Sequence, residues 1–204
     1  LVSMLAAKSE ATSESAVKLL LCLAEHHPSQ KTVVRRLVEV LTMTNISAQL
    51  KASEALAELS SRNVYHRTTI VRAGAIEPLV GLLGNGMRAE TGTPPERAAA
   101  VLADLARLAE GKTEIARCGG IDPLAQLIRS NNPGAQQHAV IALFHLSAAG
   151  DNRQDITRKG SIPALVNLLR SGTVEAKRAA AGTLWHLATT ADSKIAVVNA
   201  GGIE

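Results

Sequence analysis

The sequence has very few aromatic residues. Trp185, Tyr65 and Phe144 are the only three among 204 residues. With so few rings, the core must be built from Ala, Leu, Val and Ile, which suits closely packed helices. The shortage also disfavours nucleic-acid binding by base stacking, because that mode needs exposed aromatic side chains beside cations.

Cysteine is scarce as well. Cys22 and Cys118 are the only two, and they lie far apart and outside any Cys-x-x-Cys pair. The sequence therefore indicates neither a disulfide framework nor a cysteine zinc site, and we expect a reducing compartment, the cytoplasm or alternatively the nucleus. Cys22 and His26 are four residues apart, as metal ligands on a helix can be. One such pair without two further ligands is a weak signal, so no metal site is predicted.

Long hydrophobic runs and long charge runs are both missing. The longest apolar stretch, residues 19–24, is far shorter than the roughly 20 residues of a membrane span, so none is expected. The net charge is +4, and the densest basic cluster is Lys31, Arg35 and Arg36. This weakly positive net charge is compatible with an acidic partner but does not require one. A hydrophobic content of 46% with 20% charged residues is enough for a core, which excludes a disordered chain.

Motifs for catalysis are lacking too. No Gly-rich phosphate loop occurs, no nucleophile lies at a matching spacing from a histidine, and paired carboxylates occur only on the repeating face described below. We therefore expect a protein that is not an enzyme, with no catalytic residues, no cofactor and no small-molecule substrate.

What the sequence does contain is an internal repeat. One turn signature occurs four times, as Ala73-Gly-Ala-Ile76, Cys118-Gly-Gly-Ile121, Lys159-Gly-Ser-Ile162 and Ala200-Gly-Gly-Ile203. Its isoleucines are 45, 41 and 41 residues apart, and each of the first three copies continues into an apolar stretch. A degenerate copy of that stretch occupies residues 34–41.

The turn and helix-start residues of one unit predict three helices. The glycine allows a turn through positive φ after a short first helix, and Pro78, Pro123 or Pro163 stands in the first turn of the second. A longer helix rich in Ala and Leu closes the unit. Such third helices are predicted at residues 13–24, 48–60, 95–109, 135–148 and 175–189. No strand-like alternation occurs, so the predicted fold class is all-α.

Two local features accompany the repeat. Residues 84–96 form an insertion with Gly-Asn-Gly and Thr-Pro-Pro, which predicts a long surface loop. Arg72, Arg117 and Arg158 recur near the ends of the first helices. A cation complements a helix C-terminus there, so a capping role is favoured over a phosphate site.

This unit of about 41 residues, with its Gly-Gly-Ile turns and the sequence Ala-Gly-Thr-Leu-Trp-His-Leu-Ala at residues 181–188, resembles the armadillo repeat. The resemblance covers essentially the whole chain and is strongest from Tyr65 onward. It implies a right-handed armadillo-type α-solenoid of about four to five three-helix repeats. We expect a single array over residues 1–204, incomplete at both ends. Its units are roughly 1–33, 34–62, 63–109, 110–150 and 151–190, with 191–204 starting another.

A stack of such repeats has a concave face lined by the third helices. In the family, an Asn before the last core Leu of this helix binds the backbone of an extended peptide. The residues at this position here are Cys22, Glu58, Asp104, His145 and His186. One turn earlier lie Lys18, Glu54, Ala100, Ile141 and Gly182, with no Trp of the kind that nuclear-import adaptors use. About one turn further toward the start of each third helix lie Lys51, Arg97 and His138. In the last unit, Arg178 is one residue away from the equivalent position.

These residues predict a polar groove. Glu54, Glu58 and Asp104 form an acidic centre that can accept a Lys or Arg side chain. His138, His145 and His186 form a neutral-to-cationic patch that can exchange hydrogen bonds with a peptide backbone. The alternative is a solvated face without a ligand. Phe144 and Trp185, each one residue before a histidine of this row, are predicted to pack between adjacent third helices, with a contact at the groove edge as the alternative.

The expected function is a scaffold that binds an extended segment of a partner protein. The alternatives are a structural repeat module of a larger protein, whose ends make the contacts, and a recruiting arm of an enzyme such as a ubiquitin ligase. Apolar surface is expected at both ends of the array, where it would favour flanking repeats or end-to-end self-association. The residues concerned are Leu1, Val2, Leu5, Leu19, Leu20, Ile195, Val198 and Ile203.

Overall fold

The structure is a computed structural model that describes residues 4–5, 10–25, 27–84 and 93–202. These residues form thirteen α-helices and no strand, so the predicted all-α class is confirmed. The helices are α1 (Glu10–Glu25), α2 (His27–Leu41), α3 (Ile46–Arg62), α4 (Val64–Arg72), α5 (Ile76–Leu83), α6 (Pro94–Leu105), α7 (Ala109–Arg117), α8 (Ile121–Leu127), α9 (Pro133–Ser147), α10 (Gly150–Arg158), α11 (Ser161–Ser171), α12 (Val174–Leu187) and α13 (Ala191–Asn199).

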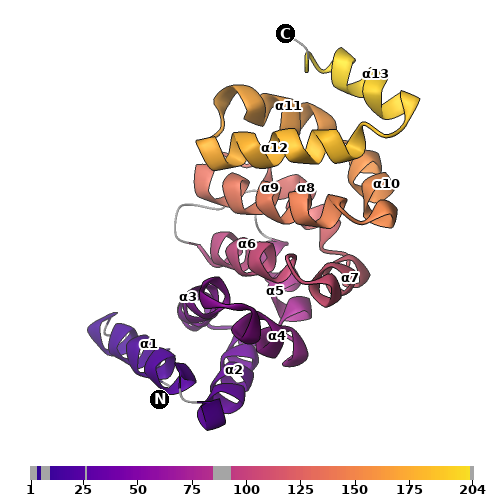
Figure 1. The fold of residues 1–204 in the computed structure, drawn as a ribbon. Helices are drawn as coiled ribbons and strands as arrows, with labels where there is room; N and C mark the ends of the chain where they lie inside the picture. The colour runs from indigo at the N-terminus through magenta and orange to yellow at the C-terminus, as the bar shows by residue number, and fades with distance from the viewer. Residues whose placement is uncertain (1–3, 6–9, 26, 85–92, 203–204) are drawn as a thin grey trace.

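The helices stack into a solenoid (Figure 1). The long helices α3, α6, α9 and α12 lie side by side along the stack, and α2, α5, α8 and α11 each pack against the long helix that follows them. Every buried hydrophobic side chain in the described ranges is Ala, Val, Leu or Ile, as expected from the shortage of aromatic residues. The small Ala side chains allow neighbouring long helices to approach closely.

Glycines end the short helices α4, α7, α10 and α13. Gly74, Gly119, Gly160 and Gly201 all have positive φ, between 64° and 77°. After three of these helices the next residue closes the turn. Ala75 N donates to Ile70 O at 3.4 Å, and Gly120 N donates to Ile115 O and Gly202 N to Val197 O, both at 2.9 Å. This is the hydrogen-bond pattern of a Schellman cap. The turn signature therefore ends a short helix through a glycine with positive φ, as the sequence predicts.

The second unit departs from the three-helix pattern. α2 runs unbroken over His27–Leu41, so the predicted boundary between residues 33 and 34 falls inside it and no separate short helix precedes it in the described range. The reason is local, because residues 27–41 contain no glycine to take a left-handed conformation. α2 thus has about two more turns at its start than the equivalent helices α5 and α8.

Two predicted boundaries are wrong. The loop predicted at 84–96 ends earlier, since α6 begins at Pro94, where a proline needs no N–H partner and has a preset φ. Residues 85–92 lie outside the described ranges. The helix predicted at 95–109 ends at Leu105, and Ala109 already begins α7.

Apolar exposure at the ends is only partly as expected. Leu19, Ile195 and Val198 are exposed, but Leu5 and Leu20 are buried in the core. Neighbouring residues on a helix point about 100° apart, so Leu20 can enter the core of α1, α2 and α3 while Leu19 faces out. The predictions for residues 1, 2 and 203 lie outside the described residues. None of the helices described is both long and apolar enough to cross a membrane.

Candidate functional site

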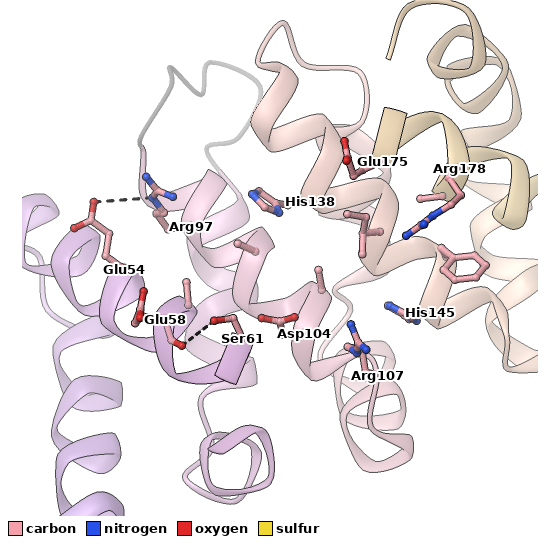
Figure 2. Close-up of a pocket in the computed structure, with 16 residues that line it drawn as sticks. Glu54, Glu58, Ser61, Arg97, Asp104, Arg107, His138, His145, Glu175 and Arg178 are labelled. Carbon is pink, nitrogen blue, oxygen red and sulfur yellow. Dashed lines mark hydrogen bonds and ion pairs between the residues drawn. The ribbon is translucent and has the colours of Figure 1, made fainter. Parts of the chain in front are cut away.

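A groove with a volume of about 920 Å³ crosses the face formed by α3, α6, α9 and α12 (Figure 2). Its lining residues are Glu54, Ala57, Glu58, Ser61, Arg97, Ala100, Ala103, Asp104, Arg107, His138, Ile141, Phe144, His145, Glu175, Arg178 and Ala179. The structure therefore brings together most of the candidate residues that the helical spacing selects. They converge because equivalent positions of stacked helices face the same side.

Four candidate residues do not line this groove. Lys18 and Cys22 lie on α1 at the end of the stack, and Trp185 and His186 lie near the C-terminal end of α12. The metal-ligand pair Cys22 and His26 gains no support, because His26 lies outside the described residues. In the described part of the chain, no three side chains of His, Cys, Asp or Glu gather as ligands for a metal ion.

Two of the three glutamates that line the groove, Glu54 and Glu58, are already paired with cations. Glu54 lies 3.1 Å from Lys51 Nζ and 3.9 Å from Arg97 Nε, and the second pair joins α3 to α6. Glu58 lies 3.2 Å from a guanidinium nitrogen of Arg62, which also pairs with Glu25 of α1. The predicted acidic centre is therefore largely neutralised from within the protein.

Asp104 differs from the glutamates. Its Oδ2 accepts a hydrogen bond of 2.9 Å from the hydroxyl of Ser60, the residue after the last core Leu of α3. No ion pair joins Asp104 to any described cation. Its negative charge is fixed in place by Ser60 and remains available to a cationic ligand.

Two cations of the groove are equally available. Arg107 follows the end of α6 and Arg178 lies on α12, and both point into the groove near His145 (Figure 2). Neither guanidinium is in an ion pair or hydrogen bond with the described residues. The C-terminal half of the groove therefore has a net positive charge, with Arg107 and Arg178 against the carboxylate of Glu175.

The histidines themselves are neutral near pH 7. Burial lowers the pKa of His138 below its ordinary value. Burial, followed by the charges of Arg107 and Lys112, lowers the pKa of His145, and burial, followed by Arg153, lowers that of His186. Within the predicted neutral-to-cationic range, the lowered pKa values favour the neutral ring, which can both donate and accept a hydrogen bond.

Phe144 and Trp185 occupy equivalent positions but behave differently. The ring of Phe144 stacks on that of His186, with centroids 5.3 Å apart and an interplanar angle of 7°, and it fills the space left by Gly182. It packs between α9 and α12 as predicted, and it also lines the groove. The same prediction is wrong for Trp185, which is 75% exposed. Phe144 has a following long helix to pack on, whereas no long helix follows α12 in the described residues.

The sequence reasoning missed several lining residues. Ser61 and Arg107 each lie three residues after a predicted groove position, and Glu175 lies three before Arg178. Extending the same helical face by one turn at each end would have found them. Both Arg178 and Ala179 reach the groove, so neither residue alone represents that position of the row.

Comparison with known proteins agrees with this geometry. Residues 109–148 and 151–189 match the sequence model of the Armadillo/beta-catenin-like repeat. The comparison with curated proteins finds no match. Among solved structures, an engineered protein is 29% identical with a TM-score of 0.80, and the match covers 98% of this chain and 83% of that one.

Two further solved structures match in fold. A designed armadillo repeat protein in complex with the peptide (KR)4 is 22% identical, with a TM-score of 0.79 and coverage of 99% of this chain and 87% of that one. Computationally designed armadillo repeat proteins for modular peptide recognition are also 22% identical, with a TM-score of 0.80 and coverage of 99% and 87%.

Proposed function

Because the chain is an armadillo-repeat solenoid, we propose that it is a scaffold that binds an extended peptide segment of a partner protein along the groove of α3, α6, α9 and α12. The observation that carries this proposal is the groove itself, which spans four stacked helices instead of forming a closed pocket in one unit. An extended chain can follow such a row and meet one set of side chains for each repeat.

The lining has the two components that peptide recognition needs. Its floor is apolar, with Ala57, Ala100, Ala103, Ile141 and Ala179, and this can take the side chains that point inward from an extended peptide. Its walls are polar, and the neutral rings of His138 and His145 can donate to or accept from the peptide backbone.

The unpaired charges define the preferred peptide. Asp104, near the middle of the groove, and Glu175 can each accept a Lys or Arg side chain, whereas Arg107 and Arg178 can bind a carboxylate nearby. A peptide that carries a basic residue and an acidic residue close together in sequence fits this arrangement better than a purely basic one. The peptide complex of the designed armadillo protein supports peptide binding by this fold, and the ligand in that complex is the basic peptide (KR)4.

The test is a selection of short random peptides against the chain, with binding measured by fluorescence anisotropy. Ile141→Arg fills the apolar floor with a charged side chain and is expected to weaken the selected peptides by at least tenfold. Val174→Arg is the matched control, because Val174 is 79% exposed on the same helix layer and does not line the groove. It should leave the affinity unchanged.

A second pair of variants tests the charge assignment. Asp104→Asn should weaken peptides with a basic residue, while Glu58→Gln, which alters a carboxylate already paired with Arg62, should have a smaller effect. If no peptide is selected, or if Ile141→Arg binds as well as the unaltered chain, the groove is unused. The alternative of a structural repeat module would then stand.

A further inference from the structure

A second cavity, of about 840 Å³, lies between α2 and α4, which pack against each other near the start of the stack (Figure 1). Its lining residues are Lys31, Arg35, Val64, Tyr65, Thr68, Thr69, Arg72 and Ala73. None of them lines the groove, so a ligand in this cavity would be independent of the proposed function.

The cavity exists because of the long α2. In this unit no short helix precedes the second helix, and the extra turns at the start of α2 take its place. Lys31 belongs to these extra turns, and Arg35 lies one turn further along the same face. The cavity is thus a property of the one unit that lacks the glycine break.

The charge of the lining is entirely positive. The side chains of Lys31, Arg35 and Arg72 form no ion pair and no hydrogen bond with the part of the chain described, and the lining contains no acidic residue. Like charges four residues apart on a helix, such as Lys31 and Arg35, destabilise it unless an anion lies between them. The hydroxyls of Thr68 and Thr69 donate to the carbonyls of Val64 and Tyr65, so the charged donors of the three cations are the main groups that a ligand can use.

The repeat supplies an internal comparison for Arg72. The equivalent residues of the next two units are Arg117 and Arg158, each in the last turn of its helix as the capping prediction requires. Arg117 pairs with Glu114 at 2.7 Å and Arg158 pairs with Asp155 at 3.1 Å, in both cases three residues back. The residue three before Arg72 is Thr69. Arg72 is therefore the member of this set without a carboxylate, and it is the one that faces two further cations.

We propose that this cavity binds an organic phosphate, with the phosphate group held by Lys31, Arg35 and Arg72 and its apolar stem against Val64 and Tyr65. A phosphate monoester has a charge of about −1.5 to −2 at pH 7 and three acceptor oxygens, which suits three cations from two helices. Val64 and Tyr65 are exposed and offer apolar surface beside the charges. The volume suits a small molecule or one phosphorylated side chain.

The experiment titrates the full chain with phenyl phosphate, inorganic phosphate and a short peptide that contains phosphotyrosine, and follows amide shifts by NMR. Phenyl phosphate should bind saturably and at least tenfold more tightly than inorganic phosphate, because of its stem. A phosphopeptide that binds more tightly than phenyl phosphate would assign the ligand to a phosphorylated chain, and equal binding would assign it to a free organic phosphate.

Three variants locate the site. Arg72→Gln should weaken phenyl phosphate by about tenfold or more, the loss expected for a charge-assisted hydrogen bond. Thr69→Asp should do the same by giving Arg72 the internal partner that Arg158 has in Asp155. Arg158→Gln is the matched control and should leave binding unchanged.

Several results would overturn the proposal. One is the absence of saturable shifts with phenyl phosphate. Another is equal binding of phenyl phosphate and inorganic phosphate, which would remove the role of the stem. A third is an equal loss in Arg158→Gln and Arg72→Gln, since that would show only a general effect of net charge. Circular dichroism confirms that each variant is folded. If Thr69→Asp does not fold, Arg72→Gln alone still tests the site.

Discussion

The hydroxyl of Ser60 at the end of α3 lies 2.9 Å from Asp104 Oδ2 on α6 and donates a hydrogen bond to it. The same contact recurs two units further on, where Ser147 Oγ of α9 lies 2.8 Å from His186 Nδ1 of α12. Ser147 can donate to the carbonyl of Phe144 and accept from Nδ1–H, which satisfies both groups. The serine after the last core Leu of one long helix thus orients the groove-row residue of the next.

We expect Ser60 and Asp104 to be energetically coupled. A double-mutant cycle with Ser60→Ala and Asp104→Ala should give a coupling free energy of about 1 kcal/mol, the usual net value of one hydrogen bond. Urea unfolding followed by circular dichroism measures it. Ser61→Ala is the control, because its hydroxyl bonds to Glu58 O and not to Asp104, so its coupling should be near zero. Equal couplings for Ser60 and Ser61 would contradict this account.

Two glycines should respond oppositely to alanine. Gly74 has φ of 75°, and a Cβ added there would meet no atom within 4 Å, so Gly74→Ala introduces backbone strain alone and should destabilise the chain by about 1 kcal/mol. Gly81 lies inside α5 with equally open surroundings, so Gly81→Ala should stabilise by about 0.5–1 kcal/mol. Thermal unfolding midpoints should therefore move in opposite directions, and a shift of the same sign in both variants would refute the assignment.

Gly182 makes room for Phe144. A Cβ at Gly182 would lie 2.5 Å from Cε2 of that ring, so Gly182→Ala must displace it from His186. Overpacking costs about 1–3 kcal/mol, which exceeds the gain of about 1 kcal/mol from replacing a helical glycine, so we expect net destabilisation. In a Phe144→Ala background the clash is gone and Gly182→Ala should stabilise. Chemical denaturation of the unaltered chain and the three variants checks this reversal of sign.

Acidification should weaken the fold through His138. Burial holds the pKa of this ring below its ordinary value in the folded chain, so the unfolded chain binds more protons. Its contribution to stability is complete above about pH 6.5, the unfolded value, and falls as the pH drops toward the lowered folded value. Thermal unfolding midpoints measured between pH 7.5 and pH 5 should decrease.

His138→Asn provides the control for that titration. The groups that face this ring are Glu96, Arg97 and Asp104, and they remain in the variant. His138→Asn should therefore show a smaller decrease of the midpoint over the same pH range. An identical pH dependence in the variant and the unaltered chain would assign the effect to other groups.

Much of the candidate site follows from helical spacing. Glu58, Asp104 and His145 share one position of the repeat, and the structure places all three on the groove. Their electrostatic state did not follow from spacing. Glu54 is neutralised in part by Arg97, which is 43 residues away in sequence, and that pairing exists only once α6 has docked on α3.

The sequence by itself determined the local breaks and the repeat. Gly74, Gly119, Gly160 and Gly201 take positive φ and the prolines stand in first turns, because these choices depend on the backbone of one residue and its neighbours. Only the tertiary structure decided that Trp185 is exposed while Phe144 is packed, and that Arg72 faces Lys31 and Arg35 without a carboxylate. Those outcomes depend on which helix lies beside each side chain, and sequence periodicity records the facing direction of a residue but not its neighbour.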